Sequence, residues 1–190
     1  MKISNFKFQI STSGFTLLEL LVVISIIGIL AGLSVASFSG SRRATRDGQR
    51  KVHLSQVRTA LESYYSANGV YPTTSNGWWG TCSDYGSHPR TGANGYVPGL
   101  APDYIDQLPI DPTDTSAAGG NSKIGSSACG AIGAVGGGAC YVYKSEGTDY
   151  KLLAHCTPES FPVQSNNPFY DPSRPSHAWQ VHSSPTSETW

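Results

Sequence analysis

The stretch from Phe15 to Phe38 constrains the fold of this chain more than any other feature. Its 24 residues contain one ionisable group, Glu19. At about 1.5 Å per residue, a helix of this length crosses the ~30 Å hydrocarbon core of a bilayer. Residues 15–38 are therefore predicted to form a transmembrane helix. A carboxylate in such a helix costs about 2.5 kcal/mol or more towards the bilayer centre, which predicts a functional partner for Glu19.

A short motif opens this stretch. Gly14-Phe15-Thr16-Leu17-Leu18-Glu19 follows a short basic leader and precedes the apolar helix. It resembles the N-terminus of type IV prepilins and type II secretion pseudopilins. The resemblance implies cleavage by a prepilin peptidase between Gly14 and Phe15 and N-methylation of Phe15. It also implies that Glu19 neutralises the N-terminal ammonium of a neighbouring subunit during assembly. A signal peptide is the alternative, but its apolar region would be only about 7–15 residues long.

The remaining chain suits one modest soluble domain. We expect a leader at 1–14, a membrane and assembly helix at 15–38, an amphipathic stem helix at 39–67 and a globular head at 68–190. The formal net charge of zero conceals +2 in the leader, −1 in 15–38, +4 in 39–66 and −5 in 67–190. An acidic head on a basic stem is no nucleic-acid signature, so no nucleic-acid partner is assigned.

The basic stem conflicts with the expected orientation. Five basic residues between Arg42 and Lys51 outnumber the two in the leader, so the positive-inside rule would keep the head in the cytoplasm. The resemblance implies the opposite: a single-pass precursor in the cytoplasmic membrane with its head outside, and then a periplasmic or extracellular filament. We adopt the orientation that the resemblance implies, because the head also carries four cysteines in a small, glycine-rich body.

Two patterns describe the long helix. Small residues recur at every fourth position from Gly28 through Gly32 and Ala36, which predicts close helix packing; unconnected, tolerated glycines are the alternative. The stem shows the 3.6-residue period of an amphipathic helix, with apolar residues at Leu54, Val57, Leu61 and Tyr64. One helix over about 15–67 is predicted to end near Asn68-Gly69, with His53 and Arg58 on its solvated face.

The head begins as an irregular loop and ends in strands. Turn residues fill 70–123, and the segment 108–112, LPIDP, resembles a pattern of major pseudopilins. Residues 140–144 and 150–156 predict a β-hairpin, and residues 169–181 a last short strand. If Val142 and Leu152 face the stem helix, period-two alternation puts Tyr141, Tyr143 and Leu153 on the other face. Trp78-Trp79 are predicted to pack over the loop, with a binding surface as the alternative.

The four cysteines are predicted to form disulfides. Four cysteines allow three pairings. We favour Cys129–Cys140 with Cys82–Cys156, and Cys140–Cys156 is the alternative.

No catalytic constellation is found. The five histidines form no HExxH motif, and the cysteine spacings fit no zinc site. The resemblance raises the question of calcium, but the acidic groups show no EF-hand spacing, so solvated turn carboxylates are the expectation for Asp111, Asp114, Asp149 and Asp171. No metal and no cofactor is predicted.

The sequence thus predicts an α+β pilin fold, with a long N-terminal helix, an irregular αβ-loop and a small antiparallel sheet on the helix's C-terminal half. The expected function is structural: a subunit of a pilus or pseudopilus that forms a helical homo-oligomer. Its expected partners are the prepilin peptidase, an inner-membrane assembly platform and, before assembly, membrane lipid. The alternative is a membrane-tethered minor pilin that binds DNA, sugar or a secreted substrate.

Overall fold

The computed structural model describes residues 14–113, 139–155, 159, 165–175 and 177–190. The chain divides into two compact units, residues 1–40 and residues 41–190, and each is considered by itself. The elements are the helix α1 (Leu17–Asn68), the strand β1 (Trp79–Gly80), the 3-10 helix η1 (Ser83–Tyr85), the strands β2 (Tyr141–Ser145), β3 (Tyr150–His155) and β4 (Ala178–His182), and the helix α2 (Pro185–Glu188). The α+β class is confirmed.

Helix α1 ends where turn chemistry predicts. Gly69 follows its last residue with φ at +73°, and its N–H donates to the carbonyl of Tyr65 at 2.7 Å. Glycine enters this left-handed conformation without a side-chain clash, so it closes the helix. Pro72 follows and prevents continuation of the helix. The predicted end near Asn68-Gly69 is confirmed.

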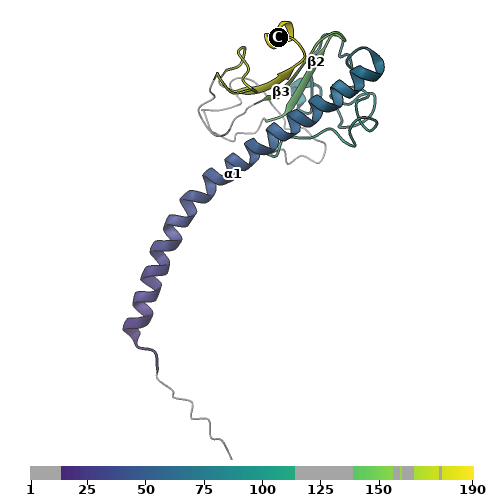
Figure 1. Cartoon of the computed structure of the whole chain (residues 1–190). Coiled ribbons are helices and arrows are strands. Elements are labelled where there is room, and N and C mark those ends of the chain that lie inside the picture. Colours follow the sequence, from purple (N-terminus) through teal and green to yellow (C-terminus); the bar gives the residue numbers. More distant parts are fainter. Residues whose placement is uncertain (1–13, 114–138, 156–158, 160–164, 176) are drawn as a thin grey trace, which may run out of the picture. The chain divides into compact units, whose positions relative to one another are not determined.

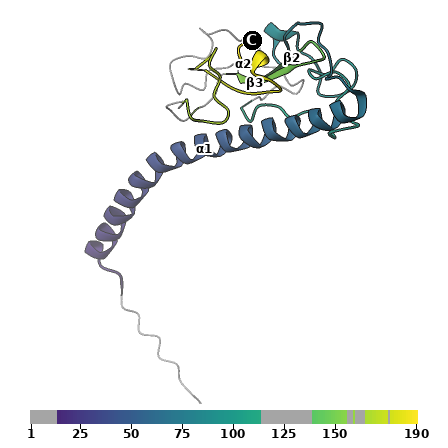
Figure 2. The ribbon, with the colours of Figure 1, turned by 45° about the horizontal axis from the view of Figure 1, so that its top comes forward.

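The four strands form one antiparallel sheet in the order β1-β2-β3-β4. In Figures 1 and 2, β2 and β3 lie over the C-terminal part of α1. The predicted hairpin and the predicted last strand are both present. The core between helix and sheet joins Leu54, Val57 and Leu61 of α1 to residues of the strands that include Tyr143 and Leu152.

The hairpin register corrects the predicted faces of β2. Val142 lies opposite Leu153, and Tyr143 lies opposite Leu152. Tyr143 and Leu152 therefore share the core with α1, whereas Val142 and Leu153 join Cys82 in a cluster of their own. The prediction that Val142 and Leu152 share a face is wrong, because Ser145 pairs with Tyr150 and the turn is one residue shorter than expected.

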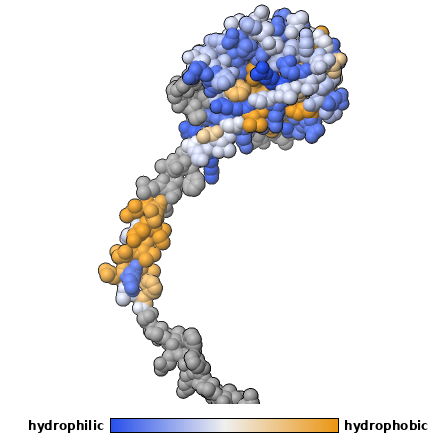
Figure 3. All heavy atoms as spheres, viewed as in Figure 1, coloured by the Kyte–Doolittle hydropathy of each residue, from blue (hydrophilic) through white to orange (hydrophobic). Residues whose placement is uncertain are grey.

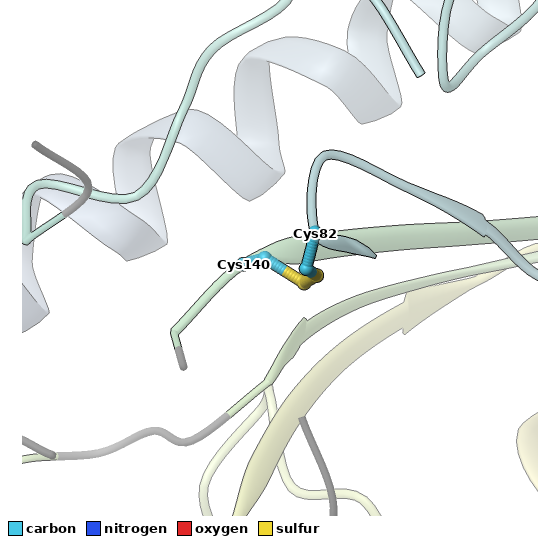
Figure 4. The surroundings of a disulfide bond; sticks show 2 residues. All are labelled: Cys82 and Cys140. Carbon is cyan, nitrogen blue, oxygen red and sulfur yellow. A yellow bond between two sulfur atoms is a disulfide. The ribbon is translucent and has the colours of Figure 1, made fainter. Parts of the chain in front are cut away.

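The predicted disulfide pairing is also wrong. Cys82 is bonded to Cys140, across 58 positions of sequence (Figure 4). The bond ties the segment after β1 to the residue before β2. It excludes Cys129–Cys140, Cys82–Cys156 and Cys140–Cys156, because each of these needs a sulfur that is already used. Cys129 and Cys156 lie outside the described residues.

The connecting loop is folded, as predicted. Tyr96, Val97, Leu100 and Leu108 are fully buried in the main core, and the hydroxyl of Tyr96 donates to the carbonyl of Pro109 at 2.9 Å. The C-terminal segment is held by a second set of polar contacts. The buried Lys151 ammonium on β3 lies 3.1 Å from Asp171 and donates to the main-chain oxygen of Glu188 in α2 at 2.7 Å.

Candidate assembly site

The N-terminal motif forms a reciprocal helix cap. Thr16 precedes the first residue of α1, and its hydroxyl accepts a hydrogen bond from the Glu19 N–H at 3.2 Å. In return, Oε2 of Glu19 accepts from the Thr16 N–H at 3.0 Å and from the Thr16 hydroxyl at 2.8 Å. This is the capping-box arrangement, which satisfies N–H groups that a helix start leaves without partners. Glu19 therefore has a partner within its own chain.

The predicted cleavage point lies just outside this cap. Residues Gly14, Phe15 and Thr16 have no regular secondary structure, and the Phe15 side chain is 80% exposed. Because the peptide bond between Gly14 and Phe15 precedes the helix, an enzyme reaches it without unwinding α1. Cleavage, methylation of Phe15 and docking through Glu19 remain predictions.

The first turns of α1 are apolar on every side. Of the 15 large apolar side chains that are exposed in the described chain, 12 lie between Phe15 and Leu30. Figure 3 shows them as a continuous orange surface on the first part of the helix. A soluble monomer rarely leaves so large an apolar patch in water. No helix made of residues that the structure describes is long and apolar enough to cross a membrane.

The small-residue row has no packing role within the described chain. A methyl group added at Gly28 or Gly32 would meet no atom within 4 Å. Ala36 lies in α1, but its side chain is outside the described part of the structure. Close packing at Gly28, Gly32 and Ala36 remains a prediction about contacts with other molecules.

Further along α1, a buried ion network joins the helix to the head. The guanidinium of Arg50 donates to both carboxylate oxygens of Asp111, at 2.7 and 2.8 Å. It also donates to Asp47 at 2.9 Å and to Glu159 at 2.7 Å. Arg46, one turn before Arg50 on the helix, donates from Nε to Oε1 of Glu159 at 2.7 Å. The side chains of Arg50 and Asp111 are both 0% exposed.

The network favours the charged forms of Arg50 and Glu159. Burial alone would lower the pKa of Arg50, but hydrogen bonds and charge from Asp111 and Glu159 raise it well above its usual value. Burial alone would raise the pKa of Glu159, but hydrogen bonds from Arg46 and Arg50 lower it. Asp111, the acidic residue of the LPIDP segment, thereby fixes that loop to the stem helix.

Several predicted solvated groups prove to be buried. Asp111 and Asp171 form buried ion pairs, which corrects their assignment as solvated turn carboxylates. Asp149 is half-buried and accepts from the Ser183 hydroxyl at 3.0 Å, and Asp114 lies outside the described residues. His53 is also half-buried, with Nδ1 2.7 Å from the Tyr141 hydroxyl, whereas Arg58 is exposed as predicted.

The paired tryptophans contact cations and a ring within the chain. Trp79 stacks on His88, with 4.0 Å between ring centroids and 5° between ring planes. Trp78 lies under two cations, Arg174 at 5.1 Å and Lys144 at 5.8 Å. Trp79 thus packs on the connecting loop as predicted, whereas the contacts of Trp78 are with cations of β2 and of the segment before β4. Among the described residues, no group of three or more histidine, cysteine or acidic side chains could hold a metal ion.

Comparison with known proteins identifies the N-terminal motif. The prokaryotic N-terminal methylation motif matches residues 11–35. Type II secretion system core protein G of Klebsiella pneumoniae is 40% identical over 100 residues, which are 52% of this chain and 67% of that protein. The protein of the same name from Klebsiella michiganensis is 38% identical over 103 residues, which are 54% of this chain and 68% of that protein.

The chain belongs to the pseudopilin family of type II secretion system core protein G. This pseudopilin is also similar to a pilin, the type IV major pilin protein PilA of Myxococcus xanthus, with 33% identity over 70 residues, or 37% of this chain and 32% of that protein. No solved structure matches it. The names of these relatives are those of a secretion-system core component and of a pilin, and none of them is the name of an enzyme.

Sequence reasoning identified the N-terminal motif of this pseudopilin and missed its ion network. Arg50 and Asp111 are 61 positions apart, and Arg50 and Glu159 are 109 apart. One signal was present. Asp47 and Arg50 stand seven and four residues before Leu54, so they continue the row of Leu54, Val57 and Leu61 on the same face of the helix.

Proposed function

We propose that this pseudopilin is the repeating structural subunit of a type II secretion-like pseudopilus. The chain is made as a single-pass precursor in the cytoplasmic membrane, with its head outside. A prepilin peptidase cuts between Gly14 and Phe15 and methylates Phe15. An inner-membrane assembly platform then adds the subunit to a helical homo-oligomer in the periplasm or outside the cell. Family membership and the methylation motif support this proposal.

The observation that carries the proposal is the concentration of exposed apolar side chains at residues 15–30. Burying one Leu or Ile side chain gains about 1.5–3 kcal/mol, so this surface is stable only in lipid or against other protein. A filament subunit needs both environments in turn. Membrane lipid covers residues 15–38 before assembly, and neighbouring subunits cover them afterwards. Gly28, Gly32 and Ala36 then allow the helices of neighbours to approach closely.

The capping box gives Glu19 two successive roles in this scheme. In the precursor its carboxylate accepts hydrogen bonds from Thr16. After cleavage, the ammonium on Phe15 of a neighbouring subunit is the complementary group in an apolar filament interior. An unpaired buried charge there is strongly penalised, so Glu19 exchanges its bonds to Thr16 for an ion pair with the neighbour. This exchange sets the register of each added subunit.

Two substitutions at one position separate docking from capping. Glu19→Ala removes both the charge and the cap, whereas Glu19→Gln removes the charge and keeps a side chain that suits a capping box. Tagged variants are co-expressed with wild-type chain, and sheared filaments are probed for the tag. We expect cleavage at Gly14 to persist and both variants to be absent from filaments. If Glu19→Gln entered filaments as well as wild type, capping would be the role of Glu19 and not docking.

The alternative of a minor pilin that binds DNA, sugar or a secreted substrate is not proposed. Its best candidate surface was the tryptophan pair. Trp79 is stacked on His88, and the cations of Lys144 and Arg174 lie over Trp78, so both rings already have partners within the chain.

A further inference from the structure

A buried ammonium group lies where the last segment of the sequence meets the sheet. It belongs to Lys151 on β3, whose side chain is 0% exposed. The ammonium donates to three oxygens: a carboxylate oxygen of Asp171 at 3.1 Å and the main-chain oxygens of Glu188 at 2.7 Å and Trp190 at 2.9 Å. A lysine ammonium has three N–H donors. Each donor therefore has an acceptor, which allows the charge to be buried.

The three acceptors come from different parts of the head. Asp171 lies before β4, Glu188 is the last residue of α2, and Trp190 follows that helix. Helix α2 packs on β3 and β4, and Figure 2 shows it beside β3. The ammonium on β3 thus fixes both ends of the segment 171–190 to the sheet.

A second cation supports the first. Nη1 of Arg174 donates to the other carboxylate oxygen of Asp171 at 3.2 Å and to the main-chain oxygen of Trp190 at 2.8 Å. The Ser173 hydroxyl donates to the main-chain oxygen of Thr189 at 2.9 Å. Main-chain oxygens at the end of a helix have no partner within that helix. Here the side chains of the head supply the missing donors.

These oxygens are of the kind that calcium binds, because carboxylates and main-chain oxygens are its usual ligands. The resemblance to major pseudopilins raises the question of calcium at such a place, and the residues present do not fit it. The Lys151 ammonium fills the space between the three oxygens. Asp171 already faces two positive side chains, both of which would repel a divalent cation.

We propose that the Lys151 ammonium, supported by the Arg174 guanidinium, is a built-in cation that takes the place of a metal ion in closing the segment 171–190 onto the sheet. The head of this pseudopilin therefore folds without calcium. Assembly of the pseudopilus is also independent of the calcium supply, and this second statement rests on the proposed function.

Removal of the ammonium tests its role. In Lys151→Met, an apolar side chain of similar length leaves the three oxygens without their donor. We expect the detergent-solubilised full chain to melt about 6–20 °C below wild type, because one partner of a buried ion pair is lost. Amide hydrogen exchange in residues 183–190, measured by mass spectrometry, should be faster by about tenfold or more, since this segment opens locally.

Lys144→Met is the matched control. Lys144 stands opposite Lys151 in the hairpin register, and its ammonium lies over the rings of Trp78 and Trp190. The control removes an ammonium from the neighbouring strand without taking a donor from the three oxygens. It should lower the melting temperature by less than about 4 °C, as expected for a cation–π contact. If Lys151→Met behaved as Lys144→Met does, the Lys151 ammonium would not be the closing cation, and the proposal would be wrong.

Calcium titration tests the independence from metal. The melting temperature of wild type should agree within about 1 °C in the chelator EGTA and in about 5 mM calcium chloride, because a ligand of the folded state would raise it. A calcium-dependent rise in wild type would overturn the proposal. Lys151→Asp replaces the built-in cation by a carboxylate beside the same oxygens, and we expect it to gain the calcium response that wild type lacks. If it gained none, these oxygens would not form a cation site, and the proposal would fail.

Filament assembly separates this inference from the proposed function. With an assembly system, wild type should give equal amounts of sheared filament in medium with EGTA and in medium with added calcium. If no filament formed under either condition, the proposed function would fail. If filaments formed only with calcium, the proposed function would stand and the built-in cation would be refuted.

Discussion

Arg50 provides the sharpest test of how the stem helix is fixed to the head. Its guanidinium makes four hydrogen bonds to Asp111, Asp47 and Glu159, all of them buried. In Arg50→Met, a side chain of similar length fills the space but leaves these carboxylates without that cation. Removing one partner of a buried ion pair costs about 3–5 kcal/mol, because the remaining charge stays desolvated.

The expected loss is a large share of the head's stability. A domain of this size has roughly 5–15 kcal/mol in total. For about 150 residues, 1 kcal/mol shifts the melting temperature by about 2–4 °C, so Arg50→Met should melt roughly 6–20 °C below wild type. Near-ultraviolet circular dichroism of the detergent-solubilised full chain measures this, because the core of the head contains buried tyrosine and tryptophan side chains. Arg58→Met, an exposed arginine on the same helix, is the control and should change stability by less than about 0.5 kcal/mol.

The pH dependence of the stability loss in Arg50→Met shows whether the loss comes from the ion network. The pKa of Glu159 is lowered in the folded chain, so its contribution is present above the unfolded value of about 4.3 and is lost as pH falls through the folded value. Once Glu159 is neutral, the Arg50 guanidinium has one charged partner fewer, so its loss costs less. The gap between Arg50→Met and wild type should narrow below about pH 4. An Arg50→Met variant within 1 kcal/mol of wild type at pH 7, or a gap unchanged at low pH, would refute the reasoning.

Two further predictions concern the head. Non-reducing peptide mapping should recover a Cys82–Cys140 peptide, and either cysteine bonded to another partner would contradict the structure. Replacing both cysteines by serine should lower the free energy of unfolding by about 4 kcal/mol, since the bond closes a loop of 58 positions. Burial, and then the charges of His177 and Arg174, lower the pKa of His155 to about 4. An unfolded histidine takes up its proton near pH 6.5, so stability should fall by about 3 kcal/mol from pH 7 to 4 in urea titrations, and an equally steep fall in His155→Phe would rule this histidine out.

Local sequence patterns predicted most of the elements. The spacing of Leu54, Val57 and Leu61 predicted the buried face of α1, and Gly69 marked its end. The hairpin followed from two strand-forming runs joined by a turn segment, and the last strand from a short run after a proline-rich turn. The N-terminal motif likewise predicted the family, because its residues are consecutive and their order alone identifies it. In each case the interacting groups are a few positions apart, so the periodicity of one element determines the result.

Tertiary structure decided every pairing between distant segments. The turn between β2 and β3 is one residue shorter than the sequence predicted. Because side chains alternate along a strand, Val142 and Tyr143 therefore lie on the opposite faces of the sheet from those predicted. Cys140 is bonded to Cys82 and not to a cysteine nearer in the sequence. Arg50 bonds to carboxylates that lie 61 and 109 positions away in the sequence. Pairs so far apart produce no periodic pattern from which they could be predicted. Which distant groups meet depends on the path of the connecting loop, and that path is set by the packing of the whole head around α1.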